Sequence, residues 1–367
     1  MDDRVREHAE VLVDWSARVE AGDQVVMDVA EGAHDLAVAV AAEVGKRDAT
    51  LLTTYGSSEV GRAFLRAGDD GREFAHSEPE LAMLEAADVY LRIGGGRNTT
   101  ALADVDGDRR QRSRKATTAT REARMDTDWV STVHPTRSLA QQAGMAYEEY
   151  RDFVYDAVLR DWEALADEMA NMKEVLDAGS EVRIETERTD LTMSIEDRTA
   201  VNSAASVAYD SHNLPSGEVF TAPHATDGEV FFDVPMTIDA RRVQDVSLTF
   251  EDGEVVDFAA EQGEEAIADV LDTDEGARRL GELGIGMNRG IDRFTDSILF
   301  DEKMGDTIHL ALGRAYDACL PEGESGNDSA VHVDMITDVS EDSRMLVDGD
   351  VVQRNGTFRW EEGFEAE

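Results

Sequence analysis

The segment from residue 300 to residue 335 contains carboxylate and imidazole side chains spaced as metal ligands. His332 and Asp334 alternate with apolar residues, and because successive side chains on a strand point to opposite faces, both would project from one face. A second apolar run carries His309, and Glu302 precedes that run in a predicted loop. Imidazole and carboxylate groups are ligands for divalent metal ions. The segment therefore predicts a metal site.

Two further glutamates lie upstream in unusual surroundings. Glu218 follows a proline and glycine turn in the string NLPSGEVFTAPH, just before a short predicted strand. Glu282 stands in the string LGELGIG, where a helix predicted over residues 275–283 gives way to glycine. A carboxylate buried in such a place needs a cation or hydrogen-bond donors as partners. Both residues therefore join the candidate site.

The candidate ligands are too numerous for one structural zinc ion. Such an ion binds four side chains in a tetrahedron and commonly uses cysteine, which is absent from the candidates. Two divalent ions about 3.5–4 Å apart, bridged by a carboxylate and a water, would use the whole set. Zinc, cobalt and manganese all accept this mixture of ligands, and the sequence does not choose among them. The six candidate ligands are Glu218, Glu282, Glu302, His309, His332 and Asp334.

The first half of the chain shows strands that alternate with helices. Residues 4–20 have the apolar spacing of an amphipathic helix, on which we expect His8 at the surface. The alternation of apolar runs with helical segments predicts a mostly parallel α/β domain. The predicted strands cover residues 24–29, 50–54, 89–93 and 129–133, and a helix is predicted over residues 35–44.

The second half of the chain is predicted to be rich in strands. It follows a long helical stretch over residues 138–172, which is interrupted only at Gly144. From Glu181 onward the side chains alternate with period two, and hairpin turn sequences occur at residues 252–253 and 348–349. The two predicted domains are an N-terminal α/β domain over residues 1–178 and a β-rich α+β catalytic domain over residues 179–367.

The composition is strongly acidic. The 367 residues include 80 Asp and Glu against 35 Lys and Arg, which gives a formal net charge of -45, while 41% of the residues are hydrophobic. The acidic residues are spread along the chain among apolar ones, as in a folded protein. Such a surface stays hydrated in concentrated salt and repels other anions. We therefore expect a halophilic protein that binds neither nucleic acid nor an anionic membrane surface.

Targeting and redox signals are sparse. The single cysteine, Cys319, excludes a disulfide within the chain. No apolar run approaches the roughly 18 residues of a membrane span, and the first residues do not resemble a signal peptide. These features predict a cytoplasmic location.

Two other functions fit parts of the sequence. Residues 94–96 form a glycine-rich turn after a predicted strand, where phosphate sites are often built, although the spacing matches neither the dinucleotide fingerprint nor a P-loop. One alternative is therefore a nucleotide-binding regulatory protein with a structural metal site, and another is a catalytically silent scaffold. His212 and His224 lie close to Glu218 in the sequence and are alternative ligands.

Five strings in the C-terminal half resemble the aminopeptidase T/aminopeptidase S family of metallo-aminopeptidases, in their order as well as their letters. A looser similarity around HPTRSLAQQAGMAYEEYRDFVYDA extends the resemblance into the first half. The five strings are NLPSGEVFTAPH, LGELGIG, FDEKMGDTIH, HLALGRAY and SAVHVDM.

The resemblance implies a homodimeric two-metal hydrolase that releases the N-terminal residue of peptides. It matches the six candidate ligands to metal positions and Tyr316 to a tyrosine of the family's active site. In such a mechanism the metals activate a water molecule, and Tyr316 donates a hydrogen bond to the developing oxyanion. A glutamate outside the tightest ligand set acts as general base, and Glu218 and Glu302 are both candidates.

Overall fold

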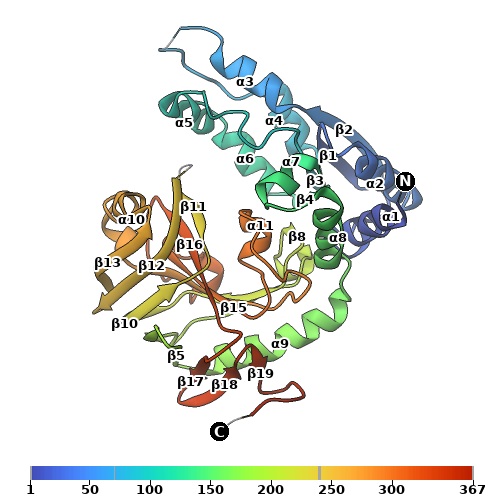
Figure 1. The fold of residues 1–367 in the computed structure, drawn as a ribbon. Coiled ribbons are helices and arrows are strands. Elements are labelled where there is room, and N and C mark those ends of the chain that lie inside the picture. The colour runs from blue at the N-terminus through green and yellow to red at the C-terminus, as the bar shows by residue number, and fades with distance from the viewer. Residues whose placement is uncertain (1, 70, 239–240, 366–367) are drawn as a thin grey trace. The chain divides into compact units, whose positions relative to one another are not determined.

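The computed structural model describes residues 2–69, 71–238 and 241–365, which form two compact units (Figure 1). Unit 1 consists of Met1–Arg160 and Ala205–Pro215, and unit 2 of Asp161–Ala204 and Ser216–Glu367. Each unit thus combines separate segments of the chain, so its limits differ from a single cut at residue 178. The functional division between residues 1–178 and 179–367 stays a prediction.

Unit 1 is built around a parallel sheet. Its strands are β1 (Gln24–Ala30), β2 (Thr50–Gly56), β3 (Val89–Gly94), β4 (Asp128–Val133) and β8 (Asn213–Leu214). They follow the order β2-β1-β3-β4-β8, and each neighbouring pair is parallel. Apolar side chains of β1 are buried in a nearly continuous run, as in sheets that helices cover on both faces. The predicted parallel α/β arrangement is confirmed.

The helices of unit 1 come between and after these strands. They are α1 (Asp3–Glu10), the π-helix η1 (Val11–Ser16), α2 (His34–Lys46), α3 (Ser58–Arg66), α4 (Glu78–Glu85), α5 (Gly107–Ala116), α6 (Thr118–Met125), α7 (Arg137–Gln142), α8 (Tyr147–Val158) and the 3₁₀ turn η2 (Val207–Tyr209). The glycine-rich turn after β3 is used within the fold. The carbonyl of Gly95 accepts a hydrogen bond from the Gly32 amide (3.0 Å), and that of Gly96 accepts one from Ser138 Oγ (2.5 Å).

The helical stretch predicted over residues 138–172 is broken twice. Gly144 ends the first helix with φ of 67°, as the sequence suggested. The second break lies at residues 159–161, where Asp161 caps a new helix, α9 (Trp162–Ala178), by accepting a hydrogen bond from the Ala164 amide (3.1 Å). The expectation of one interruption was wrong because a capping aspartate can restart a helix without a glycine signal.

His8 is buried on α1, although the sequence predicted it at the surface. A hydrogen bond of 2.8 Å joins His8 Nε2 to Thr132 Oγ1 of β4, and the ring of Tyr155 packs edge-on against the imidazole. The helix therefore faces the sheet with a polar side chain whose ring nitrogen has a specific partner. Burial, together with the positive charge of nearby His134, lowers the pKa of His8 to about 3.

The burial of His8 predicts that unit 1 loses stability in mild acid. The unfolded chain takes up a proton at His8 below pH 6.5, whereas the folded chain does not, so the free energy of unfolding is full above pH 6.5 and falls toward pH 3. By pH 5 the loss is about 2 kcal/mol. Denaturant unfolding at pH 7 and at pH 5 measures this loss of unfolding free energy. The loss should be about 2 kcal/mol smaller in His8→Asn than in the wild type. Equal drops in both proteins would contradict the assignment.

Unit 2 contains two antiparallel sheets and a few helices. The larger sheet has the order β11-β12-β10-β6-β5-β17-β18-β19, with β13 beside β12, and the smaller has the order β16-β15-β14-β9-β7. The elements are α9, β5 (Glu181–Glu185), β6 (Asp190–Ser194), β7 (Val201–Ser203), β9 (Glu218–Thr221), β10 (His224–Phe232), β11 (Met236–Ile238), β12 (Arg241–Glu251), β13 (Glu254–Gln262), α10 (Glu264–Leu271), the 3₁₀ turn η3 (Glu275–Arg278), β14 (Leu280–Gly286), α11 (Ile298–Asp301), β15 (Thr307–Gly313), the 3₁₀ turn η4 (Asp317–Cys319), β16 (His332–Asp338), β17 (Arg344–Val347), β18 (Asp350–Arg354) and β19 (Thr357–Phe358).

The helix predicted over residues 275–283 was wrong. Only the short turn η3 forms, and the chain continues as β14, whose residues are all buried. A side chain at Gly281 would place its Cβ 2.4 Å from the carbonyl oxygen of Arg314, so the neighbouring backbone leaves room only for glycine. Glu282 therefore sits in a central strand, and its side-chain direction is fixed by the sheet.

Both predicted hairpin turns are confirmed. Asp252 and Gly253 join β12 to β13, and Asp348 and Gly349 join β17 to β18, each with positive φ at both residues as tight hairpins require. The β-rich character expected for the second half is confirmed as well. Within the described part of the chain, every helix is too short or too polar to cross a bilayer.

Candidate metal centre

One face of the smaller sheet collects five of the six candidate ligands. Strand register explains this, because residues directly opposite each other on paired strands share a face, as do residues two apart on one strand. Glu282 of β14 pairs with Ala311 of β15, which in turn pairs with Asp334 of β16. His309 lies two residues before Ala311, and His332 two residues before Asp334. The central Ala311 has a small side chain, which leaves space between the carboxylates of Glu282 and Asp334.

Glu218 lies on the same face, on the strand next to β14. It is the first residue of β9 and pairs with Gly286 of β14, two steps of two residues from Glu282. Its side chain is buried, with 6% of the residue exposed. The five residues on this face are Glu218, Glu282, His309, His332 and Asp334.

These side chains form two groups that share Glu282. In the first group, His309 Nε2 lies 3.2 Å from Glu282 Oε1 and 3.6 Å from Glu218 Oε2. In the second, His332 Nε2 lies 3.3 Å from Glu282 Oε2 and 3.4 Å from Asp334 Oδ1. Within each group of three residues the ligand atoms lie within 4.8 Å of one another. The two oxygens of one carboxylate thus face two different sets of ligands.

The histidines of the two groups are oriented by their surroundings. His332 Nδ1 donates a hydrogen bond to the carbonyl of Arg314 (2.9 Å). The other ring nitrogen, Nε2, therefore faces the carboxylates and is the atom that could bind a metal. His309 is fully buried and faces Gly284 of β14. A Cβ at Gly284 would lie 2.0 Å from both Cε1 and Nε2 of His309, so only glycine at this position leaves room for the imidazole.

The pKa values of these residues are shifted by burial and by the charges around them. Burial lowers the pKa of His332, but Asp334 and Glu282 overcome this effect and raise it to about 11. Burial also lowers the pKa of His309, and Glu282 and Glu218 raise it above its usual value. For Glu218, burial raises the pKa despite the nearby cations. The buried carboxylates therefore favour positive charge on both imidazoles.

A divalent cation fits this donor set. Glu218 Oε2 is buried and accepts no hydrogen bond from the described residues, which leaves a ligand atom available. Metal ions bind neutral imidazole and ionised carboxylate and release protons on binding, so a cation would supply the charge that the imidazolium groups otherwise provide. Each group combines oxygen and nitrogen ligands, as zinc, cobalt and manganese accept.

A buried lysine completes the charge arrangement, and the sequence reading had given it no role. Lys303 has no exposed surface, and its Nζ lies 3.3 Å from Glu218 Oε1 and forms an ion pair with Glu302. Lys303 is one of only four lysines in the sequence, and it directly follows the candidate ligand Glu302. A rare lysine beside a candidate ligand is the feature of the sequence that could have indicated its role. Glu302, which follows α11, lies outside both three-residue groups and reaches the site through Lys303.

The aspartate next to Glu302 has a structural role. Asp301 accepts hydrogen bonds from the amide and hydroxyl of Thr295 (2.8 and 2.7 Å) and from the Ser297 amide (2.9 Å). Burial raises the pKa of Asp301 to about 6, although these hydrogen bonds oppose the shift. Asp301 thus fixes the loop that precedes α11.

Tyr316 lies beside the second group. Its ring packs edge-on against His332, with ring centroids 5.1 Å apart, and also contacts Phe220 at 5.5 Å. Partial burial and the charges of Glu282 and Asp334 raise the pKa of the phenol, so it stays protonated and available as a donor.

The two alternative histidines lie elsewhere. His212 belongs to unit 1, where it stacks on Trp129 with ring centroids 4.3 Å apart and its Nδ1 contacts the Trp129 carbonyl (2.8 Å). His224 contacts Ser194 Oγ and the carbonyl of Glu196 through Nε2 (3.5 and 3.4 Å). Neither belongs to the two ligand groups.

The family model described as thermophilic metalloprotease (M29) matches residues 1–358. The chain belongs to this family. The carboxylate and histidine cluster described above could hold the metal ion of a metalloprotease. The predicted resemblance to the aminopeptidase T/aminopeptidase S family is confirmed.

One solved structure and one curated aminopeptidase match nearly the whole of this M29 family member, and a second aminopeptidase matches about a third of it. The solved structure of wild-type AmpT from Thermus thermophilus matches with a TM-score of 0.86 and 27% identity, covering 97% of this chain and 99% of that chain. Aminopeptidase T from Thermus thermophilus is 28% identical over an alignment of 384 residues, 93% of each chain. Aminopeptidase 2 from Geobacillus stearothermophilus is 41% identical over an alignment of 140 residues that covers 34% of this chain and 33% of that protein.

Proposed function

We infer that this M29 family member is a metal-dependent aminopeptidase that releases the N-terminal residue of peptides. The observation that carries the inference is the position of Glu282, whose two oxygens face two ligand groups. The names of the matched relatives, aminopeptidase T and aminopeptidase 2, support the same activity. A protease that removes N-terminal residues must also attract the free α-amino group, and the carboxylates of this site provide a negative field for it.

We propose that two divalent ions would bind at the two ligand groups, which share Glu282 and contain five of the six predicted ligands, and that Glu302 is the sixth. Glu218, Glu282 and His309 would hold one ion, and Glu282, His332 and Asp334 the other. When bound, such ions lower the pKa of a water molecule and polarise the scissile carbonyl. The nature of the ions, zinc, cobalt or manganese, stays open.

Two residues of the chain are assigned to proton and charge handling. Glu302 is proposed as the general base, because it lies outside both ligand groups and is held near Glu218 by Lys303. This position also makes Glu302 the least direct of the six proposed ligands. Tyr316 is proposed to donate its phenol proton as a hydrogen bond to the oxyanion that develops next to His332.

Peptide hydrolysis is tested with aminoacyl p-nitroanilides and short peptides in molar salt. We expect turnover of substrates with a free amino terminus and none with N-acetylated ones, because only the former carry the cation that the carboxylates attract. A chelator should abolish turnover, and added zinc, cobalt or manganese should restore it. Turnover that persists after complete removal of metal would contradict the proposal, and so would equal cleavage of blocked peptides.

Three further expectations accompany this function. A homodimer, a cytoplasmic location and a halophilic surface all stay predictions. Light scattering on the purified protein measures the first, and a comparison of melting temperature at low and molar salt measures the third.

A further inference from the structure

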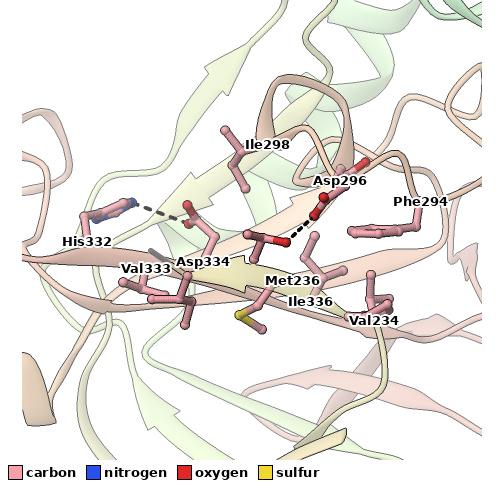
Figure 2. A pocket seen from close by; sticks show the side chains of 13 residues that line it. Val234, Met236, Phe294, Asp296, Ile298, His332, Val333, Asp334 and Ile336 are labelled. Atoms are coloured by element: carbon pink, nitrogen blue, oxygen red, sulfur yellow. Dashed lines mark hydrogen bonds and ion pairs between the residues drawn. The ribbon is translucent and has the colours of Figure 1, made fainter. Parts of the chain in front are cut away.

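A pocket of about 370 Å³ opens directly beside the second ligand group (Figure 2). His332 and Asp334 line one end of it, while Phe294 and Asp296 lie at the other end. The volume is at the lower end of the roughly 300–1,000 Å³ typical of sites for small ligands. A group bound in this pocket would therefore lie next to the residues that are proposed to hold the metal.

The walls of the pocket are mostly apolar. Met236 of β11, Phe294, Ile298 of α11 and Ile336 of β16 line it, and Ile336 is almost fully buried. Ile298 is half exposed, with 52% of its surface accessible, and it lies on the ligand side of the pocket in Figure 2. Apolar walls with a few polar groups are typical of a pocket that accepts a hydrophobic group.

Besides Asp334 of the second ligand group, two further aspartates line the pocket, and both are engaged by the protein itself. Asp301 uses its oxygens for the backbone and hydroxyl donors of Thr295 and Ser297. Asp296 accepts a hydrogen bond from Thr237 Oγ1 (2.9 Å) and forms an ion pair with Arg242 (3.5 Å). A basic ligand side chain would have to compete with these partners, so the acidic composition of the chain does not make this pocket a site for lysine or arginine.

We propose that this pocket receives the side chain of the N-terminal residue of the substrate and selects medium to large apolar side chains. The proposal rests on the aminopeptidase function inferred above. It commits to the N-terminal residue because that residue supplies the scissile carbonyl, and its side chain therefore lies nearest to His332 and Asp334. Alanine and glycine would leave the pocket largely empty, which costs affinity in proportion to the apolar surface left unburied.

The test fills the pocket and measures selectivity. Since Ile298 is exposed, Ile298→Trp should fold normally and place a bulky ring in the space for the substrate side chain. In the wild type we expect kcat/KM for Leu- and Phe-p-nitroanilide to exceed that for Ala- and Lys-p-nitroanilide by about tenfold or more. In Ile298→Trp the values for Leu and Phe should fall about tenfold or more, whereas the value for Ala should change by less than about threefold.

Two controls make the result specific. Val256 on β13 has the same exposure, 52%, and lies outside the pocket, so Val256→Trp should leave all ratios unchanged. Met236→Ala enlarges the pocket and should raise the ratio of Phe to Leu turnover. This second variant reports on the pocket even if tryptophan at residue 298 disturbs the start of α11.

The outcomes separate the two inferences. A wild-type protein without any aminopeptidase activity would contradict the proposed function. An active wild type that prefers Lys, or an Ile298→Trp variant that slows Leu and Ala substrates by the same factor, would overturn only the pocket assignment. A further experiment uses dipeptides that begin with Leu and differ in their second residue. If Ile298→Trp changed only the selectivity for that second residue, the pocket assignment would also be overturned.

Discussion

Replacing Glu282 by glutamine is expected to lower kcat/KM by at least about a thousandfold. Both carboxylate oxygens of Glu282 face histidines of separate ligand groups, so the substitution removes negative charge from both at once. The expected loss corresponds to about 4 kcal/mol of transition-state stabilisation, within the range that a metal ion supplies as a Lewis acid. Metal content per chain should fall in parallel, as measured by elemental analysis of the dialysed protein.

A matched control is available on α10. Glu265 is exposed and belongs to neither ligand group, so Glu265→Gln should retain both activity and metal. Circular dichroism should show that both variants are folded, because glutamine has nearly the size of glutamate. Full turnover and full metal content in Glu282→Gln would show that Glu282 is not the shared ligand.

Replacing Lys303 by methionine is expected to lower the free energy of unfolding by about 3–5 kcal/mol when metal is removed by a chelator. Methionine fills a similar volume, but it leaves Glu218 and Glu302 without their buried cation. Urea unfolding of unit 2 measures the effect. Added divalent metal should reduce the deficit, because the metal would supply positive charge to the same carboxylates.

Lys46→Met provides the comparison for this prediction. Lys46 also pairs with a glutamate, Glu43, but its side chain is largely exposed. Such surface pairs contribute about 0–1 kcal/mol, so the control should change stability little. Equal effects of the two substitutions, or a deficit at residue 303 that metal does not alter, would argue against a charge-balancing role for Lys303.

Much of the fold follows from patterns within single segments. Alternation of strands and helices predicted the parallel sheet of unit 1, and aspartate followed by glycine predicted two hairpins of unit 2. The spacing of His332 and Asp334 likewise placed both on one face, because a strand repeats every two residues. These are local rules, and they hold wherever the chain keeps one conformation over several residues.

The errors arose where distant segments decide the outcome. Residues 275–283 have helical composition, yet residues from Leu280 onward pair with β15 as strand β14. The backbone of Arg314 lies so close to Gly281 that only glycine fits there. His8 was predicted at the surface because histidine is polar, but it is buried because Thr132 of β4 forms a hydrogen bond with its ring. Lys303 could not be assigned a role from its sequence neighbours alone, because its partner Glu218 lies on β9, far away in the sequence. Propensity is a weak guide when tertiary contacts of this kind compete with it.

The order of the ligands along the chain also bears on biosynthesis. The chain supplies the ligands in the order Glu218, Glu282, His309, His332 and Asp334, and the last two lie on β16. β16 pairs with β15, so forming this strand pair and completing the second ligand group are one event. A nascent chain that has not yet left the ribosome beyond residue 331 therefore cannot hold the full set of ligands. Such timing would keep unfinished chains inactive toward other newly made polypeptides in the cell.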